Sequence, residues 1–161
     1  MISIRKSTLE DIDDIIRIYA HAREQMKLNN NPHQWKDSEP SIDKVINDIK
    51  HGNHYILENK DHKCGVFSMI PGKDPTYSYI EGKWLNDLDY VTIHRIASDN
   101  TVKGVFDATI SYAFERFNTV RIDTHEDNTI MRHLIEKNGF IYCGIIYLEN
   151  GEPRLAFQKT I

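Results

Sequence analysis

The segment covering residues 91–140 constrains the fold of this chain more than any other part of it. A strand-like run leads into a loop that carries Lys103-Gly104, a helical pattern follows, a second strand spans residues 120–124, and a short helix begins at Asn128. A helix that begins directly after a strand presents unpartnered backbone N–H groups at the positive end of its dipole, and such an end binds anions. Two such junctions side by side can hold an elongated, phosphate-bearing cofactor. The segment therefore favours an enzyme that uses one.

The composition is that of an ordinary globular domain. The chain has 161 residues, of which 40% are hydrophobic and 27% charged, so a single domain over residues 1–161 is expected. The net charge of −4 argues against nucleic acid or an anionic membrane as partner. No apolar run approaches the roughly 20 residues that a membrane span needs, and the N-terminus alternates like a strand rather than a signal peptide. Cys64 and Cys143 form no spacing motif, which favours reduced thiols and a cytoplasmic location.

The first half of the sequence predicts a strand, two helices and two more strands. Residues 2–6 alternate as a strand, and Ser7 with Glu10 gives a capping box for the helix that follows. The apolar positions of this helix recur at spacings of three and four, which predicts one buried face: Leu9, Ile12, Ile15, Ile16, Tyr19, Ala22 and Met26. A second helix begins after Ser41 and stops at Gly52, and strands are expected over residues 54–58 and 64–70. An irregular segment then runs from residue 71 to about residue 88.

The second half alternates strands and helices up to a terminal hairpin. Strands are expected over residues 90–97, 120–124, 140–148 and 154–159, and helices over about 104–117 and 129–137. Asn150-Gly151 is the turn signal of the last hairpin. The absence of any break in composition predicts one α+β domain around a mixed sheet.

The order of these elements, together with two motifs, resembles the GCN5-related N-acetyltransferase (GNAT) superfamily over essentially the whole chain. The family's phosphate loop, Gln/Arg-x-x-Gly-x-Gly/Ala, aligns with residues 101–106, where Gly104 matches and Thr101 and Phe106 differ. The family's second signature, Asn-x-x-Ala-x-x-x-Tyr-x-x-x-Gly-Phe, falls on residues 128–140. Its matching residues are Asn128, Gly139 and Phe140, and its departures are Met131 and Ile135. The segments 123–128 and 142–154 look like a bacterial branch of the superfamily with unassigned substrates.

The resemblance implies a mixed, mostly antiparallel sheet of about seven strands flanked by about four helices, and acetyl-CoA as co-substrate. The cofactor would lie between the splayed strands 90–97 and 120–124, with Asn128 beside it. Its pantetheine arm would bond the backbone of Ile96, Ala97 and Ser98. Its pyrophosphate would lie on the N–H groups of Val102, Lys103, Gly104, Val105 and Phe106, which need no particular side chain. Two placements of the Phe106 side chain stay open, one crowding the pyrophosphate and one, which we favour, pointing into the core with Ile110.

Acetyl transfer to an amine needs a proton acceptor, a polarised thioester carbonyl and a proton for the leaving thiolate. His94, His125 and Glu81 are the candidates for the base, the histidines because imidazole titrates near neutral pH. The alternatives are structural roles, in which His94 bonds a neighbouring backbone group and His125 caps the last helix. The usual acid of the family is a tyrosine at the position of Ile135. Tyr147 and Tyr142 on the next strand are its chemical substitutes, although for each of them we favour a packed aromatic.

The acceptor is predicted to be a primary amine of a small molecule or peptide. Carboxylates and aromatic residues of the segment 71–89, with Trp35 opposite, would suit a cationic amine, unless they only anchor a solvated loop. The eight histidines show no zinc spacing, so no metal is expected. The sequence predicts direct transfer of acetyl from acetyl-CoA, while a domain that binds CoA without catalysis, or an interaction module, stays the alternative. A homodimer is typical of the family, but periodicity reveals no interface.

Overall fold

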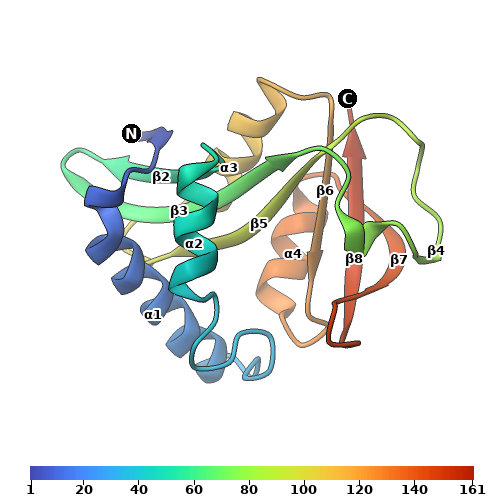
Figure 1. Ribbon diagram of the computed structural model, residues 1–161, viewed down its shortest axis with the longest axis horizontal. Helices are drawn as coiled ribbons and strands as arrows, with labels where there is room; N and C mark the ends of the chain where they lie inside the picture. Colours follow the sequence, from blue (N-terminus) through green and yellow to red (C-terminus); the bar gives the residue numbers. More distant parts are fainter.

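A single mixed sheet of eight strands forms the centre of the computed structural model, which describes all residues 1–161 (Figure 1). The strands lie in the order β1-β2-β3-β5-β6-β8-β7-β4, and every neighbouring pair is antiparallel except β5 and β6. The strands are β1 (Ile2–Lys6), β2 (His54–Asn59), β3 (His62–Pro71), β4 (Glu81–Gly82), β5 (Val91–Ser98), β6 (Thr119–Thr124), β7 (Ile141–Tyr147) and β8 (Pro153–Thr160). The mixed, mostly antiparallel α+β architecture is confirmed.

Four helices cover the two faces of this sheet. They are α1 (Ile12–Leu28), α2 (Ile42–Lys50), α3 (Val105–Phe114) and α4 (Thr129–Lys137). In Figure 1, α1 and α2 lie in front of the sheet, and α3 and α4 lie behind it. No helix is both long enough and apolar enough to cross a membrane.

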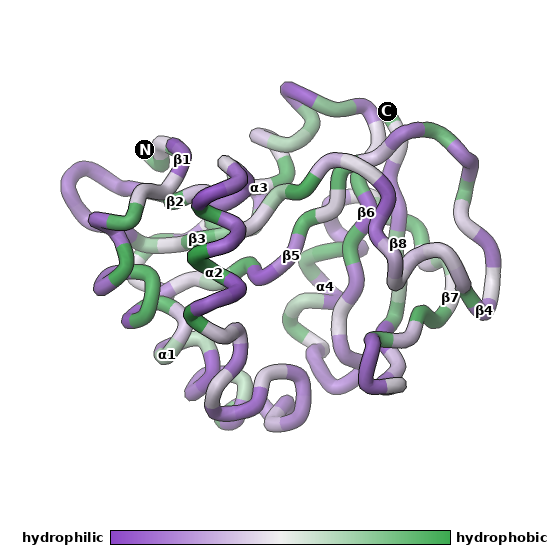
Figure 2. Tube along the Cα trace, viewed as in Figure 1, coloured by the Kyte–Doolittle hydropathy of each residue, from purple (hydrophilic) through white to green (hydrophobic).

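Alternation along the strands separates two cores. On β2, Ile56 packs with the α1 and α2 side chains, whereas its neighbours Tyr55 and Leu57 pack with α3 on the opposite face. The helices carry the matching stripes, visible as alternating colours in Figure 2. Phe106 is only 6% exposed and belongs to the α3 core with Ile110, so its predicted core placement is confirmed.

The segment between β3 and β5 covers the remaining part of the front face. It contains a 3₁₀ turn, Pro75–Tyr77, and the two-residue strand β4, which pairs with β7. Tyr77 packs there with Ile146 and Ala156 in a third apolar cluster. The sequence predicted only an irregular segment here and about seven strands, because a two-residue strand has no periodicity of its own.

Two details of the first helix differ from the prediction. The capping interaction lies one residue later than expected, because the backbone N–H of Thr8 donates to Asp11 Oδ2 at 2.8 Å, while Ser7 bonds His54 instead. Leu9 and Ile16 are about half exposed rather than buried. The buried stripe consists of Ile15, Ile18 and Tyr19.

Candidate active site

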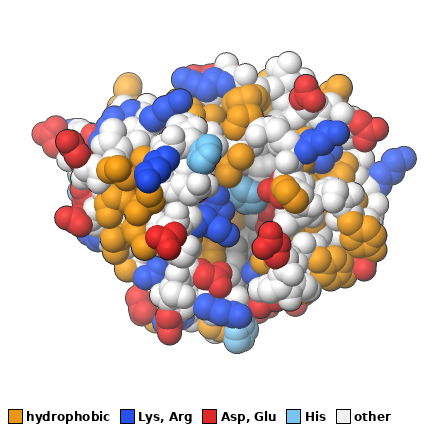
Figure 3. Space-filling view, in the orientation of Figure 1, with side chains coloured by type: hydrophobic (Ala, Val, Ile, Leu, Met, Phe, Trp, Pro, Cys, Tyr) orange, Lys and Arg blue, Asp and Glu red, His pale blue; other side chains and the backbone are white.

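The two strands at the middle of the sheet part soon after they meet. β5 and β6 pair only at Val91 with Val120 and at Thr92 with Arg121. Beyond these pairs, a cavity of about 690 Å³ opens between β5 and β6, with Ile93 to Ile96 on one side and Ile122 to Thr124 on the other. Its mouth lies on the face shown in Figure 3, where basic, acidic and histidine side chains gather around the centre.

A bulge in β5 shapes one wall of the cavity. Val66 of β3 pairs with Ala97 and Ser68 pairs with His94, so two β5 residues, Arg95 and Ile96, stand opposite one residue of β3. Arg95 has φ +52°, which is unfavourable for a residue with a side chain. Ion pairing compensates, because Nε and Nη2 of Arg95 each lie 2.8 Å from Oδ2 of the buried Asp48.

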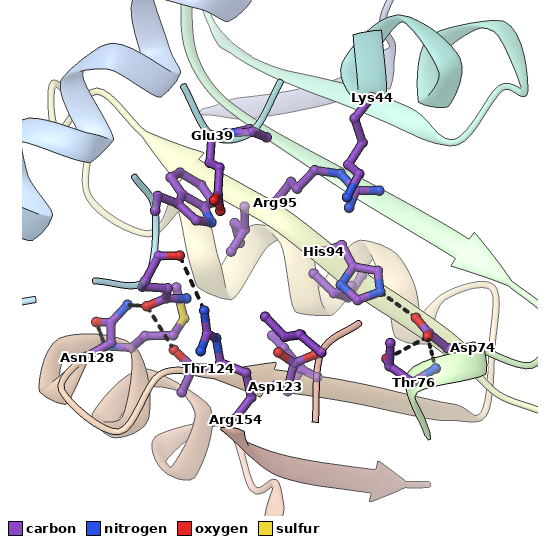
Figure 4. Close-up of a pocket in the computed structure, with 18 of the residues that line it drawn as sticks. Glu39, Lys44, Asp74, Thr76, His94, Arg95, Asp123, Thr124, Asn128 and Arg154 are labelled. Atoms are coloured by element: carbon purple, nitrogen blue, oxygen red, sulfur yellow. Dashed lines mark hydrogen bonds and ion pairs between the residues drawn. The ribbon is translucent and has the colours of Figure 1, made fainter. Parts of the chain in front are cut away.

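His94, immediately before the bulge, forms a hydrogen-bonded pair with Asp74. The distance between His94 Nε2 and Asp74 Oδ2 is 2.7 Å, and both side chains line the cavity (Figure 4). Asp74 Oδ1 also accepts from the backbone N–H and the hydroxyl of Thr76, at 2.9 and 2.7 Å. Burial acts to raise the pKa of Asp74, but the hydrogen bonds from His94 and Thr76 outweigh it and lower the pKa to about 2.

The ionised Asp74 fixes the tautomer of His94. A carboxylate only accepts hydrogen bonds, so Nε2 of His94 carries the proton that lies between the two side chains. Nδ1 is then left with a lone pair, and it has no partner within the chain. His94 is 21% exposed, which leaves it accessible from the cavity. The arrangement is that of an oriented imidazole base.

The opposite wall is built around Gln34. Its side-chain oxygen accepts from Asn128 Nδ2 at 2.8 Å and lies 3.5 Å from Thr124 Oγ1, while its backbone oxygen lies 3.4 Å from Arg154 Nη2. Trp35 follows it in the cavity wall and packs edge-on against Tyr19. Of the segment 71–89, which the sequence predicted to lie opposite Trp35, only Asp74 and Thr76 line the cavity, and none of its aromatic residues does. Asn128 also caps α4 by accepting from Met131 N–H at 3.0 Å.

The loop before α3 presents free backbone donors. The N–H groups of residues 102–107 donate to no acceptor within the chain. Gly104 has φ +89°, and a Cβ built there would meet nothing within 4 Å, so the loop faces open space. Asp99 holds its start in place by accepting from the backbone N–H and hydroxyl of Thr101 and from Arg17 and His62. Such a row of donors at a helix N-terminus matches a pyrophosphate.

Of the four candidate catalytic residues, the structure places only His94 in the cavity wall. His125 Nδ1 accepts from the backbone N–H of Asp127 at 3.0 Å, so that side chain serves the turn before α4. Glu81 lies on the edge strand β4, where its side chain bonds Tyr147 and raises the pKa of that phenol. Tyr147 also stacks on Tyr79. None of these three residues lines the cavity, and neither does Tyr142.

The candidate cofactor residues divide by location. Ile96 and Asn128 line the cavity, and Ala97 packs its side chain against α1 and so has only its backbone to offer. Ser98 is half-buried at the end of β5, and its hydroxyl accepts from the N–H of Asn100. Lys103 is exposed at the free loop.

Two residues of the cavity wall, Asp74 and Arg154, were not predicted from the sequence as part of the site. Asp74 was only one of several loop carboxylates, and Arg154 was part of a motif without a role. Asp74 meets His94 because the segment after β3 folds back over β5, and Arg154 enters the cavity because β8 lies beside β6. Neither contact has a local sequence signal.

Comparison with known proteins agrees with this geometry. Residues 2–141 match the family model described as the acetyltransferase (GNAT) domain. The chain belongs to the GNAT acetyltransferase family. A GNAT-family acetyltransferase of Streptococcus agalactiae is 32% identical, with a TM-score of 0.90 over 99% of this chain and 95% of that one. The family is thus shown by both sequence and structure.

More distant structures share the fold of this GNAT protein. A GNAT-family acetyltransferase of Listeria monocytogenes is 18% identical, with a TM-score of 0.73 over 99% of this chain and 95% of that one. A Salmonella typhimurium protein solved with its cofactor acetyl-CoA is 15% identical, with a TM-score of 0.62 over 99% and 93%. No curated protein matches the sequence.

Proposed function

We propose that the protein is an acetyl-CoA-dependent N-acetyltransferase that transfers acetyl directly to the primary amine of a small molecule or peptide. One observation carries the proposal. An imidazole with a free Nδ1, oriented by an ionised carboxylate, lines a cavity that opens where the two central strands part. Family membership is consistent with acetyl transfer, and this pair provides the base that an amine acceptor requires.

The chain's own groups fit the cofactor. The unpartnered N–H groups of residues 102–107 suit the pyrophosphate. The facing edges of β5 and β6, unpaired beyond residues 92 and 121, offer backbone donors and acceptors to an extended pantetheine arm. Phe106 points into the core and leaves the loop surface clear. When bound, acetyl-CoA supplies a thioester carbonyl for attack.

His94 is the proton acceptor in this proposal. As the amine nitrogen bonds the carbonyl carbon, Nδ1 of His94 takes the proton that the nitrogen loses. As the C–S bond breaks, His94 returns this proton to the sulfur, so the products are an amide and the CoA thiol. Asp74 stabilises the imidazolium between the two steps. No tyrosine lines the cavity and Ile135 is fully buried, which is why a shuttle on His94 is preferred to a separate acid.

The first test is thermal unfolding with and without acetyl-CoA, followed by CoA-thiol release with a broad amine panel. Acetyl-CoA at about 100 times its Kd should add roughly 2.7 kcal/mol of stability, which corresponds to about 5–11 °C in Tm for a chain of this size. Binding without thiol release from any amine would instead indicate a CoA-binding protein without catalysis. If the protein neither bound acetyl-CoA nor released CoA thiol, acetyl-CoA would be refuted as the co-substrate as well.

The second test separates the base from the cofactor site. His94→Gln should lower kcat by about 10²- to 10⁴-fold while the acetyl-CoA affinity stays unchanged. Asp74→Asn should also lower kcat, because an amide can donate to Nε2 and favour the other tautomer. His125→Gln is the matched control and should retain the rate, since that side chain lies outside the cavity wall. Full activity of His94→Gln would contradict the assignment.

A further inference from the structure

Arg154, at the start of β8, is a buried cation with poorly matched partners. Its side chain is 5% exposed and lines the cavity. Nη1 donates to the neighbouring carbonyl of Pro153 at 2.8 Å, but Nη2 reaches Gln34 O and Glu152 Oε2 only at 3.4 Å, and Nε has no acceptor within the chain. Buried arginines are normally satisfied by close carboxylates, so this guanidinium has donors to spare.

The carboxylate that pairs with Arg154 is shared with a second cation. Glu152 also pairs with Lys36 at 3.4 Å, and Lys36 is the largest cause of the lowered pKa of Glu152. Arg95, the other arginine of the cavity, shows what full pairing looks like, with two 2.8 Å contacts to one buried carboxylate. Arg154 is therefore the arginine in this cavity that is available to a ligand.

Two of the four carboxylates that line the cavity, Asp74 and Asp123, lie on the side nearer to His94. Asp123 accepts a 2.6 Å hydrogen bond from the hydroxyl of Tyr77 and keeps further acceptor capacity, and Asp74 is paired with His94. In the view of Figure 4, Asp123 lies between Arg154 and Asp74. A cavity with a spare buried cation and nearby carboxylates complements a ligand that carries both signs of charge.

We infer that the acceptor is a small amino acid-like molecule whose carboxylate binds Arg154 while its amine faces His94. This inference rests on the proposed function. A guanidinium presents paired N–H donors that match the two oxygens of a carboxylate. The volume of about 690 Å³ suits a small molecule beside the acetyl end of the cofactor. Arg154 acts as a specificity determinant and takes no part in the proton transfer.

The test uses the full chain with acetyl-CoA and two matched acceptor sets, the twenty amino acids and the twenty corresponding amino-acid amides. Mass spectrometry identifies the N-acetylated products, and CoA-thiol release gives KM and kcat for those found. The wild type should acetylate one or more acids at least 10-fold more efficiently than the matched amide. Arg154→Gln should raise KM for that acid by about 10- to 100-fold and leave KM for the amide unchanged.

Two further variants and two further measurements make the result decisive. Arg154→Lys should recover part of the acid preference, and Arg116→Gln, which removes an exposed arginine just after the end of α3, should keep all of it. The Kd of acetyl-CoA should be the same in all variants, and Tm shows whether each is folded. A fall in acetyl-CoA affinity with Arg154→Gln would overturn the inference by assigning the guanidinium to the cofactor.

Failure of this inference is separable from failure of the proposed function. Equal efficiency with acids and amides, or products only from amines without a carboxylate, would overturn the amino acid class while confirming N-acetylation. No product from either set would also overturn it. The broad amine panel and the acetyl-CoA titration then decide the proposed function by themselves.

Discussion

Acid should destabilise this protein through one histidine that takes no part in the proposed reaction. His54 is fully buried at the start of β2. Tyr19 donates its hydroxyl to Arg95 O at 2.8 Å, so it must accept at its oxygen from His54 Nε2, 3.1 Å away. Nδ1 of His54 then accepts from the hydroxyl of Ser7 at 2.7 Å. This network requires the neutral imidazole, because protonation at Nδ1 would remove the acceptor for Ser7.

The size of the effect follows from the pKa. Burial, the largest influence, lowers the pKa of His54 from 6.5 to about 4, while the nearby Asp48 and Arg95 act in opposite directions. Between these two pH values the unfolded chain binds a proton that the folded chain does not, so stability falls as the pH drops. At 1.36 kcal/mol per pH unit, the loss at pH 4 relative to pH 7 is about 3 kcal/mol. For a chain of this size, that corresponds to roughly 6–12 °C in Tm.

Urea unfolding followed by circular dichroism at pH 7, 5.5 and 4 measures this loss. His54→Gln should flatten the dependence between pH 6.5 and 4, whatever its own cost at pH 7. His33→Gln, at an exposed position, is the control and should keep the wild-type slope. The carboxylates with pKa values lowered to about 2, Asp74 and Asp99, begin to lose their stabilising contribution only below about pH 5, so they affect the lower end of this window and do so equally in the wild type and in His54→Gln. A wild-type slope in His54→Gln would refute the reasoning.

Two further predictions concern glycines. Gly104→Glu should abolish acetyl-CoA binding measured by calorimetry, because a carboxylate would stand at the phosphate loop, whereas Gly104→Ala carries the same positive-φ cost and should keep most of the affinity. Gly144→Ala should detach β4, because its Cβ would lie 2.1 Å from the Glu81 carbonyl oxygen. Amide exchange at Lys83, which donates to Cys143 O, should then accelerate, and slow exchange there would contradict the prediction. Gly151→Ala, with positive φ but open space, is the control for backbone strain alone.

Local patterns were enough to predict most of the fold. The predicted helix over residues 129–137 coincides with α4, because Asn128 is a good cap and Gly139 a good stop, here with φ +85°. The helix after Ser41 was predicted for the same reason. In the structure, Ser41 Oγ accepts from the N–H of Lys44 as a cap does. The shift from Ser7 to Thr8 at the first cap depended instead on His54, which lies 47 residues away and is hydrogen-bonded to Ser7.

The candidate site was less predictable because contacts across the sheet define it. His94 was identified from its strand and its chemistry, but its partner Asp74 depends on how the segment after β3 folds back. Glu81 and Tyr147 were singled out by their chemistry and their place in the sequence, and they meet each other at the sheet edge rather than in the cavity. Nothing in the local sequence singled out Arg154, because its spare hydrogen-bond donors become apparent only from its contacts in the folded chain.

The short stretch of pairing between β5 and β6 has a mechanical consequence. Only two residue pairs join the half-sheet β1-β2-β3-β5 to the half-sheet β6-β8-β7-β4. A molecule that bonds both free edges would act as a removable strand and complete the sheet. The affinity for such a molecule is then thermodynamically coupled to the relative motion of the two half-sheets. A substitution that restrains this motion while β5 and β6 stay apart would therefore also tighten binding.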